Sequence, residues 1–239
     1  MGEGLRDIWV YLSASPLLAL TLTLASYQLG LWIYEKGGRN PLLNPVLIAV
    51  IVLVSILLVT KTDYATYFEG AQFVHFMLGP ATVALALPLY RQLEKVRKSA
   101  LAVLASLLAG SATAAISAVG IAWAFGGSKD ILVSLAPKSV TAPVAMGIAE
   151  QLGGLPSLTA VLVILTGIIG AALGPLLLNL MGIKDMAARG LAIGTASHGI
   201  GTARAFQVSD VAGAFAGLAM GLNALATAIL LPLLWRWFF

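Results

Sequence analysis

Cysteine is absent from this sequence of 239 residues, and charged residues are scarce. Without cysteine, neither a disulfide nor a thiolate metal site can form. Charged residues make up 10% of the chain, against about 25% in soluble domains. Hydrophobic residues make up 59%, and the mean hydropathy is +0.96. This composition predicts an all-α integral membrane protein.

Several functional signals are missing as well. The first residues lack the basic stretch, short apolar run and cleavage site of a signal peptide, so we expect none. The sequence has no HExxH, GxSxG or paired acidic motif, and we expect no enzyme. No basic cluster exceeds four residues, so the net charge of +4 does not indicate a nucleic-acid partner.

Six long runs without charge are the candidate membrane spans. Each holds the roughly 20 residues that a helix needs to cross about 30 Å of hydrocarbon. The third run is interrupted at Leu78-Gly79-Pro80, between His75 and Thr82, which predicts a discontinuous helix or, more simply, a proline kink. The runs are 8–34, 40–60, 70–90, 99–128, 151–183 and 211–235.

Two further intervals, 129–150 and 184–210, each place a cation among small polar residues. Each interval is either a full crossing or a re-entrant hairpin that enters and leaves on one face. Non-helical backbone at membrane depth is tolerated only where protein covers it or where it lines a cavity. The residues expected to break the helices are Pro137 and Pro143 in the first interval and Gly194, Gly199 and Gly201 in the second.

The distribution of basic residues favours two hairpins. Two full crossings would divide twelve of them six against six, whereas two hairpins divide them eight against four. Because basic residues gather on the cytoplasmic face, we expect six crossings in the cell membrane, with both termini outside. The eight are Lys36, Arg39, Arg91, Lys95, Arg97, Lys98, Lys184 and Arg189, and the four are Arg6, Lys61, Lys129 and Arg236.

A weak internal repeat relates the two intervals. Lys129-Asp130 opens the first and Lys184-Asp185 opens the second, 55 residues later, and Ser139 then aligns with Thr195. Each interval and the long helix before it would form one helix–hairpin unit. The two units would cross the membrane in opposite orientations, as in inverted-repeat transporters. Within a single membrane domain, 1–239, the expected parts are a scaffold with the broken third helix (8–95), two helix–hairpin units (97–154 and 155–210) and a last helix (211–239).

Five stretches carry a family resemblance that extends over roughly 10–237. They are LGPATVALALPLY (78–90), PKSVTAPVAM (137–146), GGLPSLTAVLVILTGIIGAALGP (153–175), TASHGIGTARA (195–205) and GAFAGLAMGL (213–222). In these stretches the sequence resembles the LrgB/CidB family of antiholin-like membrane proteins.

That family is described in two ways. Bacterial members are called holin-like or antiholin-like, are encoded beside a smaller membrane partner, and are linked to murein hydrolase activity and lysis. A plastid relative transports glycolate and glycerate, and some bacterial members are implicated in pyruvate movement. The resemblance implies a secondary transporter of small 2-hydroxy or 2-keto monocarboxylates (glycolate, glycerate, lactate, pyruvate) and an LrgA/CidA-type partner. The alternative is a holin/antiholin-like protein that regulates murein hydrolase export and lysis through oligomerisation.

A small hydroxyacid anion needs a counter-charge and hydrogen-bond donors, and we expect both between the tips of the two hairpins. Lys138 would supply charge, Arg204 could fork onto the carboxylate, and His198 could bind the hydroxyl or keto oxygen. The expected substrate-binding residues are Lys138, Ser139, Thr141, Ser197, His198, Gly199, Gly201, Thr202 and Arg204, with Thr82 and Asn223 as weaker candidates.

Each of these residues also has a structural alternative. Lys138 could snorkel to the interface or cap the hairpin, and Arg204 could pin the hairpin to a neighbouring helix. His198 could be a packed, hydrogen-bonded histidine. The hydroxyl groups could satisfy local backbone, and Asn223 is more simply explained by an interhelical hydrogen bond.

The expected coupling follows from the same residues. No Asp or Glu lies within the two tips, so we expect neither a metal site nor a cofactor, and we disfavour sodium coupling. Proton coupling through His198 and exchange of one anion for another are equally consistent. We expect an elevator-like motion of the hairpin units against a scaffold that also forms a homodimer.

Overall fold

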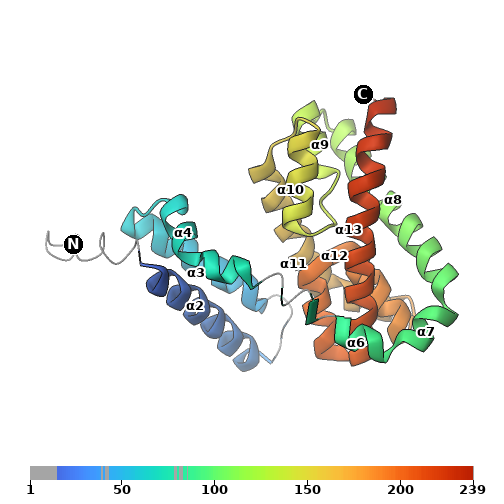
Figure 1. Ribbon diagram of the computed structural model, residues 1–239, viewed down its shortest axis with the longest axis horizontal. Helices are drawn as coiled ribbons and strands as arrows, with labels where there is room; N and C mark the ends of the chain where they lie inside the picture. The colour runs from blue at the N-terminus through green and yellow to red at the C-terminus, as the bar shows by residue number, and fades with distance from the viewer. Residues whose placement is uncertain are drawn as a thin grey trace, which may run out of the picture. The chain divides into compact units, whose positions relative to one another are not determined.

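The computed structural model describes residues 15–38, 40, 43–77, 80, 83–84 and 86–238. Within these ranges the chain is helical and contains no strand. It forms two compact units, Met1–Ala84 and Leu85–Phe239. Figure 1 shows the helices of each unit.

The first unit contains α2 (Pro16–Lys36), α3 (Pro45–Thr60) and α4 (Tyr64–Phe76). Asn44 begins α3, because its side-chain oxygen accepts hydrogen bonds from the backbone N–H groups of Val46 and Leu47. Helix α2 packs against both α3 and α4. A 2.7 Å hydrogen bond between the hydroxyl groups of Thr23 and Tyr67 joins α2 to α4.

Four described helices are long and apolar enough to cross a bilayer: Pro16–Lys36, Ala100–Ala124, Pro156–Leu180 and Asp210–Trp235. They coincide with four of the six predicted spans. The run 40–60 contains α3, an apolar helix of only 16 residues. The run 70–90 is divided between α4 and α6 (Ala86–Arg91) of the second unit, and Leu78, Gly79 and Thr82 lie outside the described residues.

The second unit is built around its last helix. Helix α13 packs against α6, α8, α10 and α12. In Figure 1, α9 and α10 lie beside the C-terminal part of α13, and α12 lies beside its N-terminal part. After α6, the helices of this unit are α7 (Leu93–Lys98), α8 (Ala100–Ala124), α9 (Lys129–Leu135), α10 (Ala142–Gln151), α11 (Pro156–Leu180), α12 (Met186–Val208) and α13 (Asp210–Phe238).

The chain reverses between α9 and α10. Leu132 of α9 lies in a buried cluster with Trp235, near the end of α13. Leu152, which directly follows α10, packs against the same cluster. Because the chain enters α9 and leaves α10 at the same end of α13, these two helices are the arms of a hairpin.

Helix α12 also contains a reversal. A β-carbon on Gly190 would collide with the backbone of Ala212, and one on Gly213 would collide with the ring of Phe206. Positions 190 and 206 therefore both lie beside the start of α13, although 16 residues of a continuous helix would span about 24 Å. The two halves of α12 run antiparallel, and they pack on the N-terminal part of α13.

Candidate functional site

The first hairpin ends in a non-helical tip, residues 136–141. Pro143 lies in the first turn of α10, where a missing N–H costs nothing, and Thr141 is the N-cap residue with extended backbone. Ser139 is buried, and its hydroxyl group lies 3.3 Å from the half-buried ammonium of Lys138. The tip thus holds one cation, with a neighbouring hydroxyl group, where α10 begins.

The second reversal occurs at His198 itself, which has φ 40° and ψ −133°. The predicted source of freedom, Gly194, Gly199 and Gly201, is therefore wrong, since none of these glycines has a positive φ. Gly194 instead allows a close approach to Ala216, whose backbone a β-carbon would strike. A non-glycine residue in this conformation costs about 1–3 kcal/mol and persists only where its surroundings hold it.

Helix α11 provides those surroundings. The imidazole Nε2 of His198 lies 2.9 Å from the carbonyl oxygen of Val163. Because a carbonyl only accepts, Nε2 carries the proton in this contact. The ring fits because Gly167 has no side chain: a β-carbon there would lie 2.8 Å from Nε2. Gly170 likewise leaves room for the hydroxyl group of Ser197.

Asn223 of α13 joins the two reversals. Its side-chain N–H group donates to the carbonyl oxygen of Ser139 at 3.3 Å and to that of Thr195 at 3.0 Å. Its amide oxygen lies 3.5 Å from the hydroxyl group of Thr227, which is 3.4 Å from that of Ser111 on α8. Asn223 is 1% exposed, so these contacts are made away from solvent.

The structure separates the predicted site residues into two groups. Lys138, Ser139, Ser197 and His198 lie at the two reversals described above. Thr202 donates to the carbonyl oxygen of His198 at 2.8 Å and so satisfies local backbone.

The remaining candidates have local roles or are not described. Arg204 donates to the side chain of Gln207 within its own helix at 2.9 Å. Gly201 packs against Ile193 of the opposite arm, and Gly199 is half-buried. Thr141 makes no side-chain cap. Thr82 lies outside the described residues.

Sequence reasoning missed the contribution of α11. Val163, Gly167 and Gly170 hold the second reversal, but they lie in a long uncharged run and carry no polar side chain of their own that would single them out. A signal was present in the spacing, because residues three and four apart share a helix face.

The chemistry available at the reversals suits a small anion better than a metal ion. Among the described residues, no group of three His, Cys, Asp or Glu side chains is placed to hold a metal. The tips instead present an ammonium group, hydroxyl groups and the N-terminal end of α10, which favours negative charge.

The profile of the LrgB-like family matches residues 23–237. This chain belongs to the LrgB-like family. Holin-like protein CidB of Staphylococcus epidermidis is 38% identical over 224 residues, which cover 94% of this chain and 96% of CidB. The uncharacterized protein YxaC of Bacillus subtilis is 37% identical, and 91% of this chain and 94% of YxaC are covered.

Holin-like protein CidB of Staphylococcus aureus is 36% identical, with 91% of this LrgB-like chain and 95% of that protein covered. No solved structure matches the chain. The family resemblance of the sequence is thereby confirmed, and the LrgB-like protein is a multi-pass, all-helical membrane protein.

Proposed function

We propose that this LrgB-like protein is a secondary transporter of small 2-hydroxy and 2-keto monocarboxylates, bound between its two reversals. The observation that carries the proposal is the position of Asn223. One amide group donates to Ser139 of the first tip and to Thr195, three residues before the second reversal. Two breaks that approach from opposite ends of α13 are therefore held within hydrogen-bond distance of one side chain.

The proposal includes the membrane topology. The α9–α10 pair and the two arms of α12 are re-entrant hairpins from opposite faces, related as inverted repeats. Ser139 and Thr195 support this relation, because they are aligned in the sequence repeat and Asn223 binds the main-chain carbonyl of both. Carbonyl groups without a hydrogen-bond donor are costly at membrane depth. The hydrogen bonds from Asn223 would remove this cost at both breaks.

The substrate carboxylate would lie against the ammonium of Lys138 and the N–H groups at the start of α10. The hydroxyl groups of Ser139 and Ser197 would bind the second oxygen of a hydroxy or keto acid. Ser197 supports this role, since its buried hydroxyl oxygen has no hydrogen-bond partner among the described residues. His198 is the candidate for proton coupling through Nδ1, which its contact with Val163 leaves free.

The motion and the partners complete the proposal. An elevator-like displacement of the hairpins against a scaffold would expose the site to each face in turn. A homodimer and a small LrgA/CidA-type membrane protein are the proposed assembly partners. Proton symport and anion exchange are both compatible with these residues, and sodium coupling is disfavoured because the tips lack a carboxylate.

A holin-like function is the second candidate, and the comparisons support it more directly than they support transport. The relatives that are 38% and 36% identical are both named holin-like protein CidB, and neither name mentions a transported solute. On this alternative the protein would regulate murein hydrolase export and lysis by oligomerising in the membrane.

Proteoliposomes that contain only this protein distinguish the two candidates. A transporter gives saturable uptake of glycolate, glycerate, lactate or pyruvate and retains a trapped fluorescent dye. A holin-like protein releases the dye without saturable uptake. Lys138→Gln should lower uptake at least about ten-fold, as expected when about 1.4 kcal/mol of binding is lost. Lys129→Gln, the same change on the exposed start of α9, should leave it unchanged.

A further inference from the structure

A positively charged segment precedes α8 and has no part in the site proposed above. Between residues 91 and 98 the chain carries four basic side chains and a single acidic one, Glu94. All five charged side chains are exposed, whereas Leu93 and Val96 are half-buried. Helix α7 therefore turns an apolar face inward and a basic face outward. The four basic residues are Arg91, Lys95, Arg97 and Lys98.

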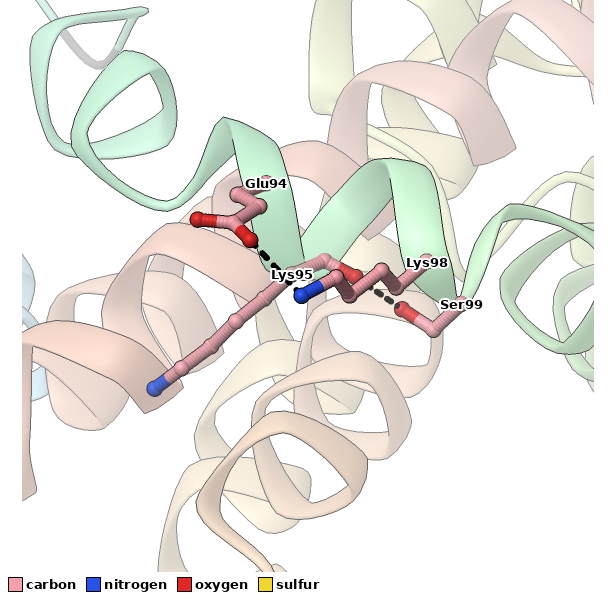
Figure 2. A network of polar contacts seen from close by, with 4 residues as sticks. All are labelled: Glu94, Lys95, Lys98 and Ser99. Atoms are coloured by element: carbon pink, nitrogen blue, oxygen red, sulfur yellow. Dashed lines mark hydrogen bonds and ion pairs between the residues drawn. The ribbon is translucent and has the colours of Figure 1, made fainter.

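Figure 2 shows how these charges are arranged. The ammonium of Lys98 lies 2.7 Å from the carboxylate of Glu94, and the two side chains are 74% and 83% exposed. The side chain of Lys95 extends away from this pair. Among the described residues, Arg91, Lys95 and Arg97 form no ion pair. Three positive charges are therefore available to a partner of opposite charge.

The segment is held at a fixed distance from a membrane span. Only Ser99 separates α7 from α8, and its hydroxyl group donates to the carbonyl oxygen of Lys95 at 2.7 Å. The six residues of α7 extend about 9 Å, which is comparable to a Debye length of about 8–10 Å. If α8 begins at the edge of the hydrocarbon, the basic side chains lie within the headgroup layer.

We propose that Arg91, Lys95 and Arg97 bind the phosphate groups of anionic phospholipids where α8 enters the bilayer. A guanidinium group can donate two parallel hydrogen bonds to two oxygens of one phosphate. Basic residues beside a membrane span are attracted to an anionic leaflet. The nearest acidic group in sequence, Glu94, is neutralised by Lys98. Asp185, at the start of α12, is engaged in capping the N–H group of Ala188.

Native mass spectrometry of the purified full-length protein tests the proposal, with equimolar phosphatidylglycerol and phosphatidylcholine as probes. We expect phosphatidylglycerol to be retained in preference. Lys95→Gln should lower its retention about five-fold, and Lys95→Gln with Arg97→Gln about thirty-fold. Lys129→Gln, beyond the opposite end of α8, is the matched control and should change nothing.

Glu94→Gln gives a change of the opposite sign, which misfolding cannot produce. It releases Lys98 from its ion pair, so phosphatidylglycerol retention should rise by up to about five-fold. Equal retention of the two lipids would overturn the proposal. So would an equal loss of phosphatidylglycerol in Lys95→Gln and Lys129→Gln, because the effect would then be one of net charge and not of this segment.

Discussion

At the scale of single residues, Asn223 stands out because its partners are main-chain carbonyl oxygens of two different breaks. A carbonyl that lies in a helix has an N–H partner four residues later, but the carbonyls of Ser139 and Thr195 precede points where the helix is interrupted. Asn223 is 1% exposed, so the amide makes both contacts away from solvent. The amide thus satisfies two acceptors that would otherwise be costly to bury.

Replacing Asn223 by alanine should therefore destabilise the protein by about 1–3 kcal/mol, the cost of leaving buried carbonyls without donors. Thermal unfolding in detergent measures the change. Thr227→Val is the control, because it keeps the side-chain shape and removes only two long contacts, at 3.5 Å with the amide oxygen of Asn223 and at 3.4 Å with the hydroxyl group of Ser111. Equal stability of the two variants would show that Asn223 does not hold the breaks.

Gly167 is the second position where a small change has a definite consequence. The β-carbon of Gly167→Ala would lie 2.7 Å from Cε1 of His198, so the ring must leave the carbonyl of Val163. We expect a loss of about 1–3 kcal/mol, typical of overpacking.

Gly120→Ala in α8 is the matched control for this variant, because a β-carbon at position 120 would have no neighbouring atom within 4 Å. It should stabilise the helix by about 0.5–1 kcal/mol, the usual gain for replacing a helical glycine by alanine. A Gly167→Ala variant as stable as Gly120→Ala would contradict the packing of His198 on α11.

Residue chemistry identified which side chains lie near the breaks, but not how they are used. Lys138 and His198 were conspicuous because they are cations or titratable groups in apolar sequence. The geometry of Arg204 was not predictable, since its contact with Gln207 depends on which way the second arm of α12 faces. Backbone propensity disfavours histidine in the conformation that His198 adopts, so the sequence predicts the break at the neighbouring glycines instead.

At the scale of elements, the reversal within α12 decides whether residues 184–210 form a hairpin or a full crossing. A β-carbon on Gly201 would lie 2.9 Å from Cγ2 of Ile193. In a continuous helix, positions eight residues apart are separated by about 12 Å. This contact exists only if the chain turns back.

The absence of cysteine makes this reversal easy to test by cross-linking. Ile193→Cys with Gly201→Cys should form an intramolecular disulfide on mild oxidation, because their β-carbons come within the range of about 3.5–4.5 Å that a disulfide spans. Ala102→Cys with Gly110→Cys has the same spacing in the continuous helix α8 and should not react. Peptide mass spectrometry identifies the product, and failure of both pairs would argue for a continuous α12.

Hydropathy predicted most of the long helices, because apolar length alone decides where a span can form. Four of the six runs became helices of sufficient length. The run 40–60 did not, because Asn44 is the N-cap residue of α3. The helix therefore begins at Pro45 and has only 16 residues. Asparagine is a preferred N-cap residue, so Asn44 inside the apolar run indicates a later helix start, which a search for uncharged runs does not detect.

At the scale of the whole molecule, we propose that two hairpins enter the membrane from opposite faces and meet at Asn223. Their packing at opposite ends of α13 supports it. Membrane topology itself depends on which ends of the helices face water. The arms of each hairpin must have both outer ends on one face, whereas a full crossing has them on two.

Labelling of single cysteines with a membrane-impermeant maleimide in intact cells tests this claim most directly. The positions are exposed and lie at the outer ends of the hairpins: Lys129→Cys, Glu150→Cys, Lys184→Cys and Gln207→Cys. We predict that the first two react from outside the cell and that the last two react only after the membrane is permeabilised. Labelling of Lys129→Cys and Glu150→Cys from opposite faces, or of all four from the same face, would contradict the account.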